Sequence, residues 1–153
     1  MKKYLITIII SLVIGFFMSQ FLLKQYNDYQ GIKVYNEGEL FYFMQYGIFD
    51  NVKEMDANTI NLENYIYQVN NDKYYVYVGI SKNLEITNKV ITYFKKMGYD
   101  IIIKEFYITN KEFSSKIDNY DKILNLTEDD IVIGEIMAQT LNSYEEVVNE
   151  SKN

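Results

Sequence analysis

The chain of 153 residues contains no cysteine and no histidine. Without cysteine it can form neither a disulfide nor a thiolate metal site, and without histidine it lacks the commonest general base and metal ligand. Arginine is also absent, so every basic side chain is lysine, and the formal charge is −6. This balance disfavours nucleic acid, whose binding depends on neutralising phosphates. We predict no metal site, no cofactor and no nucleic-acid partner.

Paired carboxylates are present, but their positions do not suggest catalysis. Asp129 and Asp130 precede an apolar helical pattern, where negative charge stabilises a helix N-terminus. Glu145 and Glu146 lie later in the same pattern and fit its solvated face. We therefore expect a protein that is not an enzyme.

Directly after Lys2 and Lys3, an apolar run begins at Tyr4 and continues to Leu23. About 20 helical residues at 1.5 Å each cross a hydrocarbon core of ~30 Å, so residues 1–24 are predicted to form a transmembrane anchor. A cleaved signal peptide is the alternative, although apolar residues continue where its cleavage site would lie. The lysine bias predicts a single-pass membrane protein with a cytoplasmic N-terminus and an extracytoplasmic body.

One short pattern occurs twice in the body, at an offset of 32 positions (79 − 47). At that offset Tyr, Gly, Ile and Asn recur in the segments YFMQYGIFDNV (42–52) and YYVYVGISKNL (74–84). Each copy is typical of a strand rich in aromatic and β-branched residues, followed by a turn and a helix. Two strand–helix–strand units of this kind predict an α+β fold.

The predicted organisation follows from these units. Residues 25–38 are polar and form a short tether, residues 39–108 form a βαββαβ domain, and residues 109–153 form a helical extension with two apolar stripes. The domain is expected to be a ferredoxin-like or RNP-like sandwich, with a four-stranded antiparallel sheet and helices on one face. Alternation predicts that the helix-covered face carries Tyr42, Met44, Tyr46 and Ile48 of the first strand and Tyr74, Val76, Val78 and Ile80 of the third.

This pattern resembles the SPOR (sporulation-related repeat) domain over residues 40–107. The similar segments are FMQYG (43–47), YYVYVGI (74–80) and KKMGY (95–99). SPOR domains are typically tethered outside the cytoplasmic membrane and bind peptidoglycan glycan strands that lack stem peptides, at division or sporulation septa. The resemblance thus implies a bacterial cell-envelope protein that binds denuded glycan.

The resemblance also implies a set of glycan-contacting residues. Carried over by position, they are Gln45, Lys73, Tyr75, Tyr77 and Ile103. Phe43 is added to this predicted site because strand alternation places it on the same open face. Independently of the family, aromatic rings on an open sheet face suit sugar C–H faces, and an amide suits hydroxyl and acetamido groups. The chain departs from the family at Ile48, where a small polar residue is usual, and lacks an arginine common on the third strand.

Three alternatives stay open at this point. Phe41 and Phe43 are equally compatible with ordinary core covered by the C-terminal helices, whose apolar stripes must be buried somewhere. Aromatics on central strands are also found in RNA-recognition domains, although a membrane anchor and an acidic body disfavour that reading. The remaining alternative is a membrane-bound envelope adaptor that keeps the fold but docks another protein instead of glycan.

Overall fold

The computed structural model describes residues 38–150. The predicted anchor, residues 1–24, and all of the predicted tether except Gly38 lie outside the described residues. Within residues 38–150, no helix is long and apolar enough to cross a membrane. The elements are, in chain order, β1 (Glu39–Phe49), α2 (Val52–Thr59), β2 (Ile66–Asn70), β3 (Lys73–Ser81), α3 (Leu84–Lys96), β4 (Ile102–Ile108), α4 (Lys111–Leu126) and α5 (Asp130–Glu150).

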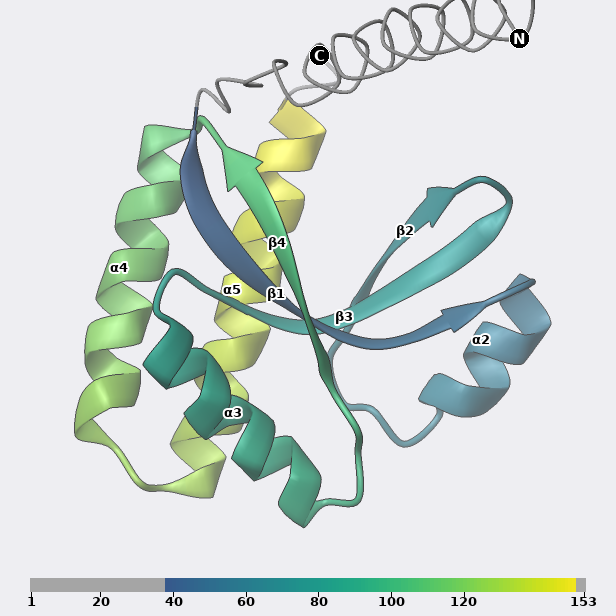
Figure 1. Cartoon of the computed structure of the whole chain (residues 1–153), viewed down its shortest axis with the longest axis horizontal. Helices are drawn as coiled ribbons and strands as arrows, with labels where there is room; N and C mark the ends of the chain where they lie inside the picture. The colour runs from purple at the N-terminus through teal and green to yellow at the C-terminus, as the bar shows by residue number, and fades with distance from the viewer. Residues whose placement is uncertain (1–37, 151–153) are drawn as a thin grey trace, which may run out of the picture. The chain divides into compact units, whose positions relative to one another are not determined.

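The four strands form one antiparallel sheet in the order β2-β3-β1-β4 (Figure 1). The two halves of the repeat therefore supply the central strands, β1 and β3, while β2 and β4 lie at the edges. The predicted α+β class and four-stranded antiparallel sheet are confirmed.

The recurring asparagine of the repeat begins a helix in both copies. Asn51 Oδ1 accepts a hydrogen bond from the backbone N–H of Glu54 at 2.9 Å. Asn83 Oδ1 accepts from the backbone N–H groups of Glu85 and Ile86 at 2.8 and 3.2 Å. These N-caps satisfy helical donors that have no intrahelical partner, so the repeat encodes a strand followed by a capped helix.

The register between β1 and β3 is interrupted twice. Met44 is opposite Gly79 and Gln45 is opposite Tyr77, which leaves Val78 as an extra residue; Gly47 is then opposite Val76, which leaves Tyr46 as another. An extra residue in a strand shifts the alternation of its side chains beyond that point.

The two irregularities correct the predicted faces of Ile48 and Ile80. Ile48 is 45% exposed, and Phe49 is buried in its place against Met55 of α2. Ile80 leaves the face of Val78 and joins Phe41 and Phe113 of α4 in another cluster. The prediction for both isoleucines is wrong because strict alternation ignored the two bulges.

Val76 and Val78 lie on the predicted core face as expected. Val76 packs with Met55 of α2, and Val78 packs with Ile86 and Val90 of α3. Both valines are buried. The short helices α2 and α3 therefore contact the predicted face of β1 and β3.

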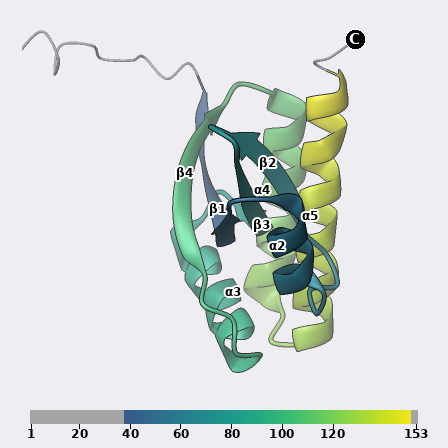
Figure 2. The ribbon, with the colours of Figure 1, turned by 90° about the vertical axis from the view of Figure 1, so that its right-hand side faces the viewer.

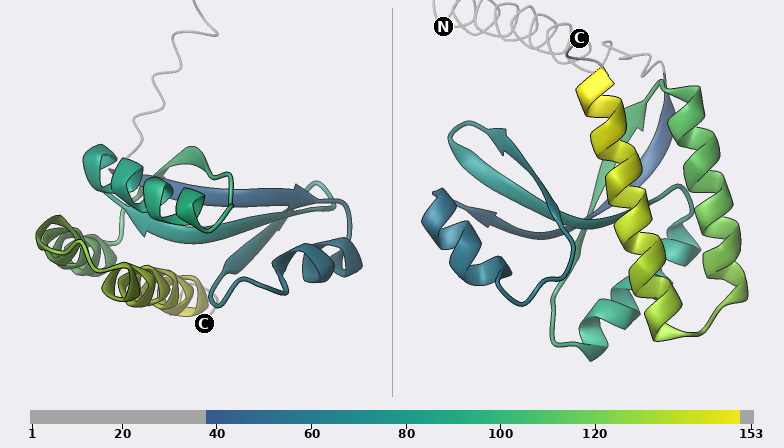
Figure 3. Two further views of the ribbon diagram at one scale, coloured as in Figure 1. Left: turned by 90° about the horizontal axis from the view of Figure 1, so that it is seen from below. Right: turned by 180° about the vertical axis from the view of Figure 1, so that it is seen from behind.

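Helices α4 and α5 cover the other face of the central strands. They lie side by side behind the sheet, whereas α3 lies on its opposite side (Figures 2 and 3). From the apolar stripes of these two helices, Phe113, Ile117 and Leu141 pack in the same cluster as Phe41 and Phe43. The C-terminal extension thus shares one core with the predicted domain. Where α3, the sheet and the pair of helices α4 and α5 overlap, the body has three layers.

We expect Val78→Asp to abolish cooperative folding of the body. Val78 is 1% exposed, and an unpaired carboxylate at that position would cost at least about 3 kcal/mol of the free energy of unfolding. Ile48→Asp is the matched control on the neighbouring strand, and its cost should be about 1 kcal/mol or less because Ile48 is half-exposed. Urea unfolding followed by circular dichroism measures both, and equal destabilisation by the two variants would contradict the assigned faces.

Candidate binding site

Three of the six predicted glycan-contacting residues are buried, and two of them, Phe43 and Tyr77, pack in the cluster that α4 and α5 cover. Phe43, Gln45 and Tyr77 are 1%, 2% and 3% exposed. They share the face of β1 and β3 that the prediction left open to solvent. In this conformation a glycan strand cannot contact them.

The ring of Phe43 is surrounded by other aromatic rings. Tyr77, Phe106 and Tyr144 each meet it edge-on, with ring centroids 5.5, 4.7 and 5.1 Å away. Such edge-to-face pairs add about 0.5–1.5 kcal/mol each beyond the area that they bury. The aromatic surface predicted to stack on sugars is therefore occupied by the protein itself, through Tyr144 of α5.

Gln45 is an exception within this apolar layer. Its side-chain oxygen Oε1 is buried and has no hydrogen-bond partner among the described residues. A buried acceptor without a partner costs about 1–3 kcal/mol. Gln45 is thus a destabilising polar group in the core of the closed structure.

The other three predicted residues are separated from this cluster to differing degrees. Tyr75 is half-buried at its margin. Lys73 is exposed at the β2–β3 turn and pairs with Asp50 at 3.1 Å, and this ion pair raises the lysine pKa. Ile103 is half-buried on β4, opposite Met44. The six residues do not form one accessible surface.

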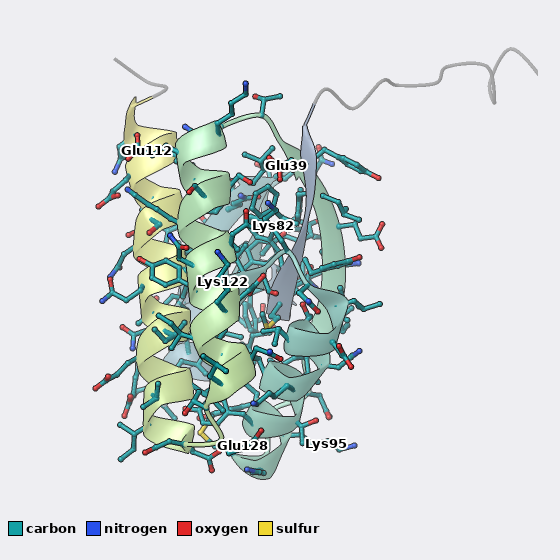
Figure 4. The ribbon with its side chains drawn as sticks, turned by 90° about the vertical axis from the view of Figure 1, so that its left-hand side faces the viewer. Glu39, Lys82, Lys95, Glu112, Lys122 and Glu128 are labelled. Carbon is teal, nitrogen blue, oxygen red and sulfur yellow. The ribbon has the colours of Figure 1, made fainter. Side chains whose placement is uncertain are left out.

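A partly exposed polar cluster links α4 to the sheet. Lys82, which follows β3, forms ion pairs with Glu39 of β1 and with Asp118 of α4, and it donates a hydrogen bond to Ser114 Oγ at 2.7 Å. Figure 4 shows Glu39 and Lys82 close together beside α4. Burial lowers the pKa of Lys82, but the bonds to Asp118 and Glu39 outweigh it and leave the pKa raised. The lysine therefore stays charged, and its ion pairs link β1, β3 and α4.

Lysines of α3 hold the turn between α4 and α5 in the same way. Lys89 Nζ donates to the carbonyl oxygens of Leu124 and Thr127, and Lys96 pairs with Asp130 at 3.0 Å. Both contacts tie the C-terminal helices to the helix on the opposite side of the sheet. Lys82, Lys89 and Lys96 thus hold α4 and α5 in place.

A groove that sequence reasoning missed runs between β2 and α5. It has a volume of about 790 Å³ and is lined by residues 65–69 on one side and by Tyr144, Glu145, Val148 and Asn149 on the other. Gln68 Nε2 donates a hydrogen bond to Tyr144 Oη across it at 2.7 Å, while Tyr67 and Val69 are 51% and 57% exposed. Its volume lies in the usual range of ligand pockets, about 300–1,000 Å³. No local pattern reveals this groove, because it depends on which helix lies beside β2.

The described residues contain no group of three or more acidic side chains placed to hold a metal ion. No protein family, curated protein or solved structure matches the chain. The resemblance to SPOR domains therefore stays a prediction.

We expect Tyr77→Ala to lower the free energy of unfolding by about 3 kcal/mol or more, because it removes a buried ring that contacts Phe43 and Phe106. Tyr107→Ala is the matched control on β4, where the ring is 48% exposed, and it should cost less than about 1 kcal/mol. Urea denaturation of the two variants provides the comparison. A Tyr77→Ala protein as stable as Tyr107→Ala would mean that α4 and α5 do not seal this face.

Proposed function

We propose that the protein is a non-catalytic docking module of the bacterial cell envelope. It is held at the cytoplasmic membrane by the run from Tyr4 to Leu23, with its folded body outside the cytoplasm, and it binds another envelope protein. Its βαββαβ order is that of a SPOR-like domain whose sugar-binding face has been taken over by a C-terminal helical hairpin.

One observation carries this proposal. The centre of the predicted glycan platform is buried: α4 and α5 cover Phe43 and Tyr77, and Gln45, opposite Tyr77, is 2% exposed. Opening that face would separate Phe43 from Tyr144 and Phe41 from Phe113, and would break the ion pair between Lys82 and Asp118. Each of these contacts stabilises the closed form. The binding free energy of a sugar ligand would therefore have to exceed the free energy of losing these contacts.

Binding of denuded glycan is the second candidate, and Gln45 is the observation that favours it. A buried amide oxygen without a partner is expected where a site opens to take a polar ligand, since the ligand would then supply the missing hydrogen bond. In that case α4 and α5 would act as a cover that is displaced by the glycan. The closed form would be an unliganded state of a glycan-binding protein.

Photo-crosslinking in cells separates the two candidates. In the full-length chain, a photoreactive amino acid would be placed at one exposed position at a time. The four positions, from different parts of the body, are Ile60, Tyr67, Tyr107 and Leu126. We expect a discrete protein adduct, unchanged by lysozyme, from some of these positions and none from the others. In parallel, the full chain in detergent should not be retained on sacculi, before or after amidase removes the stem peptides.

Two results would contradict the docking proposal. The first is an adduct from these positions that lysozyme digests, together with retention that increases on amidase-treated sacculi; it would establish the glycan candidate. The second is the absence of any adduct from all four positions. Either result would remove the reason to look for a protein partner.

A further inference from the structure

Within residues 38–150, strand β2 presents an unpaired edge of the sheet. It pairs with β3 on one side only, and a two-residue turn at Asn71 and Asp72, both with positive φ, joins the two strands. Such a hairpin closes on a hydrogen-bonded pair, here Asn70 with Lys73, and hydrogen-bonded pairs alternate from there. The backbone N–H and C=O groups of Tyr67 and Val69 therefore point away from β3 and toward the open edge.

This edge strand is short, but it carries neither charge nor proline. Natural edge strands are commonly protected by charged side chains or proline. The other edge strand, β4, has Lys104 and Glu105 at its centre, whereas the β2 sequence from Ile66 to Asn70 is IYQVN, without charge or proline. Unlike β4, β2 therefore has no charged side chain that would oppose an added strand.

The groove beside α5 gives this edge a second wall. Ile66 and Gln68 face α5, because Ile66 packs with Leu141 and Gln68 bonds Tyr144. A strand added next to β2 would place every second side chain on that same side, against Tyr144 and Val148. Its alternate side chains would lie beside the exposed Tyr67 and Val69.

The charges around the groove are negative. Glu145 lines it, and Glu63 lines an adjoining hollow that shares Tyr65 and Ile66 with it. Neither carboxylate forms an ion pair with a residue that the structure describes, and neither hollow is lined by a lysine. A second copy of the chain, with its formal charge of −6, would bring like charge to these carboxylates. A basic segment would complement them.

We propose that an extended segment of a partner protein, with alternating apolar residues and lysine or arginine between them, adds to β2 as a fifth strand. This assignment rests on the proposed docking function and specifies its site and ligand class. The backbone of Tyr67 and Val69 would supply hydrogen bonds, and the apolar side chains of the segment would lie beside the exposed side chains of Tyr67 and Val69. The lysine or arginine side chains would point into the groove, where their stems pass Tyr144 and Val148 and their charged ends meet Glu63 and Glu145.

Fluorescence polarisation with the full-length chain in neutral detergent micelles tests this site. The probe is a fluorescein-labelled peptide, Lys-Val-Lys-Val-Thr-Val-Lys, compared with the same peptide in which glutamate replaces each lysine. A third peptide carries N-methyl groups on alternate backbone nitrogens, placed to remove the N–H groups that would face β2. We expect the first peptide to bind at least tenfold more tightly than either of the others.

Two pairs of variants locate the binding. Val69→Pro removes the outward N–H and should weaken binding five- to tenfold, whereas Val69→Thr keeps the N–H and should bind within twofold of the native chain. Glu145→Lys should weaken binding at least tenfold, whereas Glu105→Lys, the same charge change on β4, should change it by less than threefold. If Val69→Pro does not fold, the N-methylated peptide still tests the backbone pairing.

Several outcomes would overturn the inference. They are the absence of binding of the basic peptide at millimolar concentration, equal binding of the acidic or N-methylated peptide, and equal effects of Glu145→Lys and Glu105→Lys. A photo-crosslinked adduct from Tyr67 of twice the chain mass would instead identify a second copy as the occupant. A partner adduct from Tyr107 and not from Tyr67 would overturn this site while leaving the docking function in place.

Discussion

The aromatic layer between the sheet and the C-terminal helices is the contact on which the rest of the structure depends. Phe43 lies at its centre, where Tyr77 and Phe106 from the sheet and Tyr144 from α5 meet one ring edge-on. Once these rings pack on one another, the central strands have no solvent-facing side over this region. Ligand contact is then left to the margins of the sheet, and β2 is the margin that has both an unpaired edge and an adjoining groove.

The distribution of charge is consistent with this arrangement. Lys82, Lys89 and Lys96 are engaged with α4, α5 or the turn between them, and Lys116 links α4 to Glu146 of α5 at 3.0 Å. A lysine that forms an ion pair within the protein is not available to bind a polyanion. The acidic side chains left on the surface give the body a field that attracts basic partners and repels a second copy.

Much of the fold could be predicted from the sequence because local chemistry specifies it. The strand compositions, the Asn-capped helices and the Asn-Asp turn all act within a few residues of one another. The faces of Ile48 and Ile80 could not be predicted, since a bulge depends on pairing between strands distant in sequence.

The candidate site was less predictable than the fold, for a physical reason. Alternating aromatic residues on central strands are equally typical of a surface that binds sugars and of a core that helices cover. Phe43 and Tyr77 therefore fit both interpretations. The apolar stripes of α4 and α5 indicate that they must be buried but not against which surface. The groove between β2 and α5 is a consequence of that same choice, and only the tertiary arrangement reveals it.

Native-state hydrogen exchange of the full-length chain tests most directly whether α4 and α5 are an integral part of the core. If they are, the central backbone amides of α4 and α5 will exchange only through the same global unfolding as those of β1 and β3, with the same dependence on urea. The contradicting result is an opening of lower free energy in which α4 and α5 exchange while β1 and β3 stay protected. Such an opening would expose Phe43, Gln45 and Tyr77 on a folded sheet and return them to the solvent-facing surface that a glycan platform requires.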